Sequence, residues 1–229
     1  LTKLESMPYL GYDRNVFSYL FFIEGITSNE NLFKYLDGFK LFGTFPILDY
    51  KKEISKKELL KPRLKVGIIG FGRFGQFIGK EMVKYDMNVY ATNRTDYTDL
   101  ANKLNIKFLK KEDFEKETFD IVILATSILS FESVLKSYSK KFLSRSLIVD
   151  VLSVKEYPKR ILNDYLPGCS LLLTHPMFGP DSAKLSWKNK NFVYYIDNIN
   201  EEFKDTCDTF IDFWRLKGCC MIEMDPEEH

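Results

Sequence analysis

Three glycines at fixed spacing are the first residues of this chain whose chemistry is suggestive. Gly70, Gly72 and Gly75 form the pattern G-x-G-x-x-G directly after an apolar run and before a helical pattern. There, the first glycine permits a tight turn, the second lets the backbone approach a pyrophosphate, and the third lets helix and strand pack closely. Arg73 and Phe74 begin the helix, whose free N–H groups attract anions. The five residues predict a dinucleotide-binding turn.

The loop after the next predicted strand should meet the ribose of that dinucleotide. An NAD site presents Asp or Glu about twenty residues after the glycines, but this chain reads Asn93-Arg94-Thr95. An arginine flanked by an amide and a hydroxyl suits a 2′-phosphate, which it binds through parallel charge-assisted hydrogen bonds. The loop therefore favours NADP. The alternative, in which Arg94 is solvated and Asp96 binds the ribose of NAD, stays open.

His175 is the candidate for acid–base chemistry. It follows a predicted strand, and open α/β sheets place their ligand crevice beyond the carboxyl ends of the strands. Thr174 and Pro176 beside it indicate a loop, where functional side chains are frequent. A neutral imidazole in that position accepts a proton from a substrate hydroxyl. A packed histidine without a catalytic role is the alternative.

Short apolar runs alternate with helical patterns and must position these residues. Such alternation indicates βαβ units and a parallel sheet. In the first helical pattern Phe74, Ile78 and Met82 share one face, and Gly218 ends the last one. We therefore expect an α/β fold, of the Rossmann type and doubly wound, with a mostly parallel sheet. Strands are predicted at residues 65–69, 88–92, 121–125, 146–149, 170–173, 192–196 and 219–222.

Composition changes along the chain and indicates two parts. Residues 1–50 contain twelve Phe or Tyr and are too aromatic for a disordered leader. Residues 51–65 are rich in Lys and Glu and contain Pro62. We expect residues 1–61 to form an aromatic extension and linker, and residues 62–229 to form the dinucleotide-binding domain.

Charge and hydropathy exclude several classes of function. The net charge of +1 indicates no field for nucleic acid. No apolar run approaches the roughly 18 residues that a membrane span needs. The four cysteines and two histidines lack the spacing of metal ligands. We expect a small-molecule substrate, with no nucleic acid, membrane or metal.

Two later segments resemble a known family. Residues 149–158 contain a Ser-Val-Lys turn, and residues 174–182 contain the run His-Pro-Met-Phe-Gly-Pro. With residues 124–130 and 223–229, they resemble the arogenate and prephenate dehydrogenases, most closely the plant-type arogenate enzymes. The resemblance begins near Lys65 and leaves the aromatic extension outside.

The resemblance implies roles for particular side chains. His175 matches the family's catalytic histidine, and Ser153 matches the serine that orients this histidine and the substrate. Ser153 is alternatively, or in addition, the cap of a helix over residues 154–161. Further polar contacts are expected to the nicotinamide from Thr126 and Ser127 and to the substrate from Lys155 and Asp181.

The implied reaction is the NADP-dependent oxidative decarboxylation of arogenate to tyrosine. Hydride leaves the ring carbon that carries the hydroxyl, and aromatisation drives the loss of carbon dioxide. Prephenate, giving 4-hydroxyphenylpyruvate, stays open as the substrate. A non-catalytic NADP-binding fragment and a different Rossmann-type reductase, acting on a hydroxy acid or imine, also stay open.

Family members continue with a helical domain that forms the dimer, closes over the substrate and supplies an arginine for its carboxylate. We expect that domain to be absent from this chain and a homodimer only for a full-length parent. By itself the chain should bind NADP but hold substrate poorly. A plant-like protein would reside in the plastid and any other in the cytoplasm.

Overall fold

The computed structural model describes residues 63–229, which lie in the second of the two units of the chain, Ile54–His229. The predicted extension and linker, residues 1–61, fall outside the described residues. The helices, strands and contacts that follow are those of residues 63–229.

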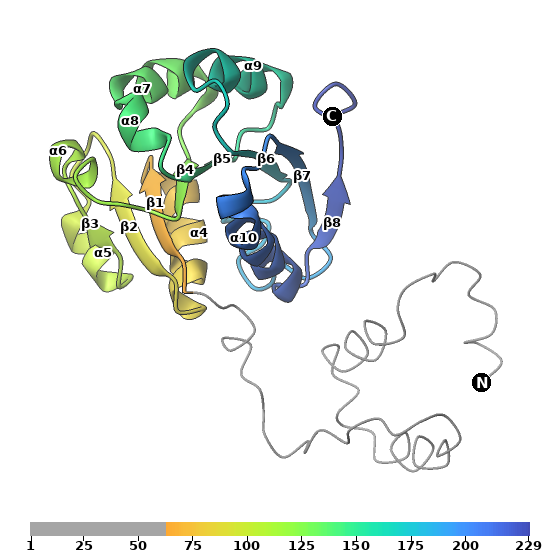
Figure 1. Cartoon of the computed structure of the whole chain (residues 1–229). Coiled ribbons are helices and arrows are strands. Elements are labelled where there is room, and N and C mark those ends of the chain that lie inside the picture. Colours follow the sequence, from red (N-terminus) through yellow and green to blue (C-terminus); the bar gives the residue numbers. More distant parts are fainter. Residues whose placement is uncertain (1–62) are drawn as a thin grey trace, which may run out of the picture. The chain divides into compact units, whose positions relative to one another are not determined.

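One eight-stranded sheet forms the centre of the fold, in the order β3-β2-β1-β4-β5-β6-β7-β8 (Figure 1). Every neighbouring pair is parallel except β6 and β7. The strands are β1 Lys65–Ile69, β2 Asn88–Thr92, β3 Lys107–Phe108, β4 Ile121–Leu124, β5 Leu147–Asp150, β6 Leu171–Pro176, β7 Asn191–Asp197 and β8 Cys220–Glu223.

Helices cover both faces of this sheet (Figure 1). On one face lie α4 Arg73–Lys84, α5 Thr98–Lys103 and α10 Lys204–Leu216. On the other lie α6 Lys111–Phe114, α7 Phe131–Ser137, α8 Lys140–Leu143 and α9 Glu156–Tyr165. Two short 3-10 turns, η2 Ile128–Ser130 and η3 Glu201–Phe203, precede α7 and α10. The expected doubly wound, mostly parallel fold is confirmed.

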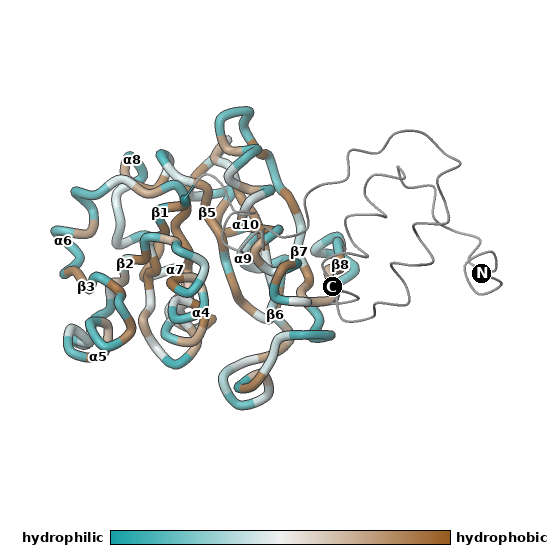
Figure 2. Tube along the Cα trace, turned by 90° about the horizontal axis from the view of Figure 1, so that it is seen from below, coloured by the Kyte–Doolittle hydropathy of each residue, from teal (hydrophilic) through white to brown (hydrophobic). Residues whose placement is uncertain are grey.

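Alternation along the strands builds the two hydrophobic cores. Val66 and Ile68 of β1 face the core beneath α4, whereas Ile69 faces the core beneath α7. Successive strand residues point to opposite faces, so a strand covered on both sides is apolar throughout. Figure 2 shows the hydrophobic residues gathered along the central strands and hydrophilic ones around the rim.

The ends of the predicted strands are confirmed within one residue, except that β6 runs three residues further than predicted, to Pro176, and the sheet shows two further differences. The short edge strand β3 was not predicted because two residues are too few for a periodic signal. Strand β7 runs antiparallel to β6. The connection between them, residues 177–190, contains no helix, and a parallel return normally needs a crossover helix.

The expectation that His175 lies on a loop is wrong. His175 belongs to β6 and pairs with Val193 of β7. Because β7 turns back directly alongside β6, the ladder continues through His175 to Pro176. The histidine therefore stands on a strand end, where its backbone is held more rigidly than on a loop.

Candidate functional site

The chain turns from β1 into α4 around the three glycines. Gly70 has a positive φ of 100°, and a Cβ there would lie 2.5 Å from the carbonyl oxygen of Ala125. A Cβ on Gly75 would lie 2.3 Å from the carbonyl oxygen of Gly70. A Cβ on Gly72 would meet nothing within 4 Å. The turn is therefore tightly packed at two glycines and open at the one expected to face a pyrophosphate.

The N-terminus of α4 also suits an anion. Gly72 is its N-cap, no side chain caps the helix, and its first turn has no acidic residue. The free N–H groups and the helix dipole therefore remain available to a phosphate. Phe74 is half-buried at this end of the helix and packs against the core. The residues present fit the phosphates of a dinucleotide.

The loop after β2 lies beside the glycine turn. The side-chain oxygen of Asn93 accepts a hydrogen bond from the backbone N–H of Phe71 at 3.2 Å. The amide nitrogen of Asn93 contacts the carbonyl of Thr95 at 3.4 Å. Arg94 and Thr95 are exposed. Asn93 thus ties the loop to the phosphate turn and leaves the guanidinium of Arg94 in solvent.

Asp96, the alternative ribose ligand, is already engaged. One oxygen of its carboxylate accepts hydrogen bonds from the hydroxyl of Thr98 at 2.6 Å and its backbone N–H at 2.8 Å. These two hydrogen bonds lower the pKa of Asp96, and the bond from the hydroxyl has the larger effect. The carboxylate therefore serves the start of α5.

Thr126 and Ser127 follow β4 on the other side of the glycine turn. A Cβ on Gly70 would lie 3.1 Å from the backbone nitrogen of Thr126. The hydroxyl oxygen of Thr126 is buried and has no hydrogen-bond partner among the described residues. The hydroxyl of Ser127 pairs with that of Ser130 at 2.9 Å. Buried polar groups are normally hydrogen-bonded, so this hydroxyl is unusual, and a contact of Thr126 with the nicotinamide stays a prediction.

Arg73 and Asp181 meet at the mouth of α4. Two oxygens of Asp181 accept hydrogen bonds from Nη2 of Arg73 at 2.7 and 2.8 Å. Both side chains are more than three-quarters exposed, so the pair contributes little to stability. The structure therefore brings Asp181 to the phosphate-binding turn, and a contact of Asp181 with substrate stays a prediction.

Lys155 forms a buried ion pair at the ends of β5 and β6. Its ammonium donates hydrogen bonds to the carboxylate of Asp150 and the carbonyl of Thr174, and its side chain is 1% exposed. Burial lowers the pKa of Lys155 and raises that of Asp150. With these bonds Lys155 joins the two strand ends, and a direct substrate contact stays a prediction.

Ser153 lies exposed in the loop between β5 and α9. The expectation that it caps a helix is wrong, because α9 begins at Glu156 with Lys155 at the N-cap and no side-chain cap. Lys155 turns inward to reach Asp150, so the helix starts too late for the hydroxyl of Ser153 to reach its N–H groups. The hydroxyl of Ser153 is therefore not used as a helix cap.

His175 is paired with the second histidine of the chain. Its Nδ1 lies 2.9 Å from Nε2 of His229. Burial is the largest cause that lowers the pKa of His175 to about 4, followed by the repulsion that His229, when protonated, and the ammonium of Lys155 exert on a charged ring. The imidazole is therefore neutral near pH 7. Its Nε2 makes no hydrogen bond within the described part of the chain and is not sealed in the interior.

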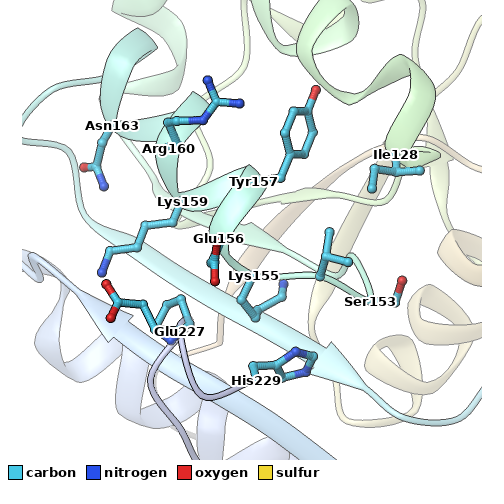
Figure 3. A pocket seen from close by; sticks show the side chains of 12 residues that line it. Ile128, Ser153, Lys155, Glu156, Tyr157, Lys159, Arg160, Asn163, Glu227 and His229 are labelled. Carbon is cyan, nitrogen blue, oxygen red and sulfur yellow. The ribbon is translucent and has the colours of Figure 1, made fainter.

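A crevice of about 1180 Å³ opens beside these residues. Ser153 and Lys155 line one part, side chains of α9 a second, and the segment after β8 with His229 a third (Figure 3). The basic side chains of Lys159 and Arg160 come from α9. Glu156 and Glu227 line the crevice together with these basic side chains, and His229, but not His175, is among its lining residues.

Two residues of the site were not predicted. His229 was considered only as a metal ligand, although it lies in the terminal segment that carries the resemblance. Asp150 lies shortly before the Ser-Val-Lys turn, and nothing in the sequence indicated that its carboxylate would be buried against Lys155. No group of three or more His, Cys, Asp or Glu side chains in residues 63–229 is arranged to hold a metal ion.

Comparisons with known proteins cover most of the chain, and the two Arabidopsis relatives align over more residues than lie between 63 and 229, so the expectation that the whole aromatic extension lies outside the resemblance is wrong. Residues 78–198 match the family described as prephenate dehydrogenase, nucleotide-binding domain. Arogenate dehydrogenase 1, chloroplastic, of Arabidopsis thaliana is 45% identical over 186 residues, covering 79% of this chain and 29% of that protein. Arogenate dehydrogenase 2, chloroplastic, of the same plant is 40% identical over 188 residues, covering 80% and 52%. The chain thus spans between about a third and a half of these relatives.

Solved structures share the fold at low sequence identity. Prephenate dehydrogenase from Aquifex aeolicus aligns with a TM-score of 0.58 at 20% identity, over 71% of this chain and 62% of that one. Synechocystis arogenate dehydrogenase aligns with a TM-score of 0.54 at 18% identity, over 71% and 60%. At this identity the likeness establishes the Rossmann-type architecture alone.

Proposed function

This chain belongs to the prephenate dehydrogenase family through its nucleotide-binding domain, and we propose that it is the cofactor-binding part of an NADP-dependent arogenate dehydrogenase. The observation that carries the proposal is the neutral imidazole of His175, which stands at the carboxyl edge of the same sheet as the glycine turn. The names of the Arabidopsis relatives support arogenate.

In the proposed reaction, the chain binds the dinucleotide along the glycine turn and the loop after β2. NADP supplies the hydride acceptor. His175 accepts the proton of the ring hydroxyl at Nε2 as the carbonyl forms, because its neutral imidazole has a lone pair there. Ser153, exposed beside the crevice, orients the histidine and the substrate. Aromatisation then drives the loss of carbon dioxide.

The preference for NADP rests on the loop after β2. Arg94 is exposed and free to grip a 2′-phosphate, with Asn93 and Thr95 beside it as donors. One oxygen of Asp96, the alternative ribose ligand for NAD, already accepts two hydrogen bonds from Thr98. The prephenate dehydrogenase from Aquifex aeolicus was crystallised with NAD+ and hydroxyphenyl propionate, so NAD is the alternative cofactor against which NADP is compared.

Activity should be assayed on the longest natural form of the protein that contains this chain, with arogenate or prephenate and NADP or NAD. We expect fastest turnover with arogenate and NADP. Changing His175→Asn should lower kcat by at least about a hundredfold and leave NADP binding intact. If prephenate is turned over faster than arogenate, the substrate is prephenate. If the protein binds NADP but turns over neither compound, it is a non-catalytic nucleotide-binding protein.

Two further properties belong to the same proposal. We expect a homodimer of the longer protein and, because the Arabidopsis relatives are named chloroplastic, residence in a plastid if the protein comes from a plant-like source. Within residues 63–229, no helix has the length and apolar character to cross a membrane.

A further inference from the structure

We propose that His229 is a positioning residue that holds the proton of His175 on Nδ1, so that Nε2 of His175 faces the substrate as an acceptor. This inference rests on the proposed role of His175 as the proton acceptor. It starts from the contact between Nδ1 of His175 and Nε2 of His229, which measures 2.9 Å.

A hydrogen bond between two neutral imidazoles needs one donor and one acceptor. Either His175 donates from Nδ1 to Nε2 of His229, or His229 donates from Nε2 to Nδ1 of His175. In the first case Nε2 of His175 carries a lone pair, and in the second it carries the proton. Only the first arrangement lets His175 accept the proton of a hydroxyl at Nε2.

The surroundings keep the pair neutral. Burial, with the nearby ammonium of Lys155, lowers the pKa of both histidines. Lys155 is held there by Asp150 and the carbonyl of Thr174. The charged side chains of Glu156 and Lys159 on α9 and of Glu227 after β8 line the same crevice. Because each neutral ring carries one proton, the ring that supplies the bridging proton decides which nitrogen of His175 has a free lone pair.

The chain brings His229 to this position by a turn after β8. The backbone N–H groups of Glu228 and His229 both donate to the carbonyl of Asp225, at 3.0 and 3.1 Å, and Pro226 in this turn is buried. The N–H of Met224 donates to the carbonyl of Tyr194 on β7. The imidazole therefore reaches the end of β6 from a braced segment (Figure 3).

Nitrogen-15 NMR of the imidazoles tests this inference on the 229-residue chain without any substrate. The chain has only two histidines, so its imidazole spectrum has two spin systems, which His229→Gln and His175→Gln assign. We expect His175 in the wild type to show a protonated Nδ1 and an unprotonated Nε2.

Two substitutions separate tautomer control from mere packing. His229→Leu removes the acceptor, so His175 should shift to the form with its proton on Nε2, which free histidine prefers in water. His229→Gln keeps an acceptor oxygen near the position of Nε2 and should retain the wild-type tautomer. Glu228→Gln, an exposed neighbour, should change neither ring. Backbone amide spectra identify any variant that fails to fold.

A proton on Nε2 of wild-type His175, or an unchanged tautomer in a folded His229→Leu variant, overturns the inference. In the longer protein, His229→Leu should lower kcat at least about tenfold with little change in KM, and His229→Gln should recover part of it. If the tautomer behaves as expected but no variant or wild type turns over substrate, the proposed function fails and the hydrogen-bond assignment stands.

Discussion

Different side chains carry the two proposed roles, proton transfer and selection of the cofactor. The neutral imidazole of His175 has its Nδ1 engaged by His229 and its Nε2 open. The guanidinium of Arg94 extends into solvent from a loop that Asn93 ties to the glycine turn. The two functions therefore depend on different residues at one edge of the sheet and can be changed separately.

Arg94 tests the cofactor preference. Replacing Arg94→Gln removes a charged donor to a 2′-phosphate, and a hydrogen bond to a charged group is worth about 1.5–3 kcal/mol. We expect the Kd of NADP to rise by about ten- to a hundredfold and that of NAD to stay nearly constant, measured by titration calorimetry on the 229-residue chain. Asp96→Asn is the matched control, and a larger loss of NAD binding in that variant contradicts the NADP preference.

The lowered pKa of His175 predicts how stability depends on pH. In the unfolded chain this imidazole binds a proton near its ordinary value of 6.5, whereas in the fold it does so only near 4. Between these values the unfolded state holds more protons, so stability falls as pH decreases from 6.5 toward 4. Urea unfolding at pH 7 and pH 5 should show a smaller loss for His175→Gln than for the wild type. An equal loss in both proteins contradicts this pKa.

At the scale of elements, the turn into α4 and the end of β5 hold the site together in different ways. The glycine turn is shaped by close backbone approaches at Gly70 and Gly75. The ends of β5 and β6 are joined by the buried pair of Lys155 and Asp150 together with the carbonyl of Thr174. Close packing shapes the glycine turn, whereas a buried ion pair joins the strand ends beside His175.

Two glycines of one turn should respond differently to alanine. Alanine inside a helix is normally favoured by about 1 kcal/mol, but a Cβ on Gly75 would meet the backbone oxygen of Gly70 at 2.3 Å. Gly75→Ala should therefore destabilise the fold by about 1–3 kcal/mol. Gly72→Ala has open space, so it should keep most of the stability but weaken NADP binding by about tenfold or more. Urea unfolding and calorimetry measure both, and equal NADP affinity in Gly72→Ala would place the phosphates elsewhere.

The buried ion pair of Lys155 and Asp150 gives a further prediction at this scale. Lys155→Met leaves the carboxylate of Asp150 buried without its partner, which typically costs about 3–5 kcal/mol. Adding Asp150→Asn removes that charge and should restore part of the loss. If the double variant is no more stable than Lys155→Met in urea unfolding, the ion pair does not stabilise the ends of β5 and β6.

At the scale of the whole molecule, the order of the strands creates the site. From β1 the chain first adds β2 and β3 on one side of the sheet. It then crosses to the other side of β1 and adds β4, β5 and β6. Ligands of open α/β sheets bind at such a switch point, beyond the carboxyl ends of the strands. The glycine turn follows β1 and the free hydroxyl of Thr126 follows β4, so both stand at that point.

This placement predicts that residues 63–229 are sufficient for cofactor binding. A shortened chain of residues 63–229 should bind NADP as tightly as the 229-residue chain, because every residue assigned to the cofactor site lies within it. Calorimetry on both chains measures the comparison. A large loss of affinity in the shortened chain would assign residues 1–62 a part in the cofactor site.

By itself, the sequence determined the features that depend on near neighbours along the chain. Strands such as Ile121–Leu124 show as apolar runs, and the glycine turn shows as a spacing of three glycines. The strand placement of His175 and the inward turn of Lys155 were not predictable, because each depends on which strand becomes a neighbour and in which direction it runs.

Only the tertiary structure decided which distant side chains meet. Arg73 and Asp181 are 108 positions apart and His175 and His229 are 54 apart, so no local pattern relates them. Their contacts follow from the order of strands, which packing over the whole sheet selects. The glycine turn and the histidine were therefore visible in the sequence, whereas the hydrogen-bond partner that would set the proton on His175 emerged from the fold.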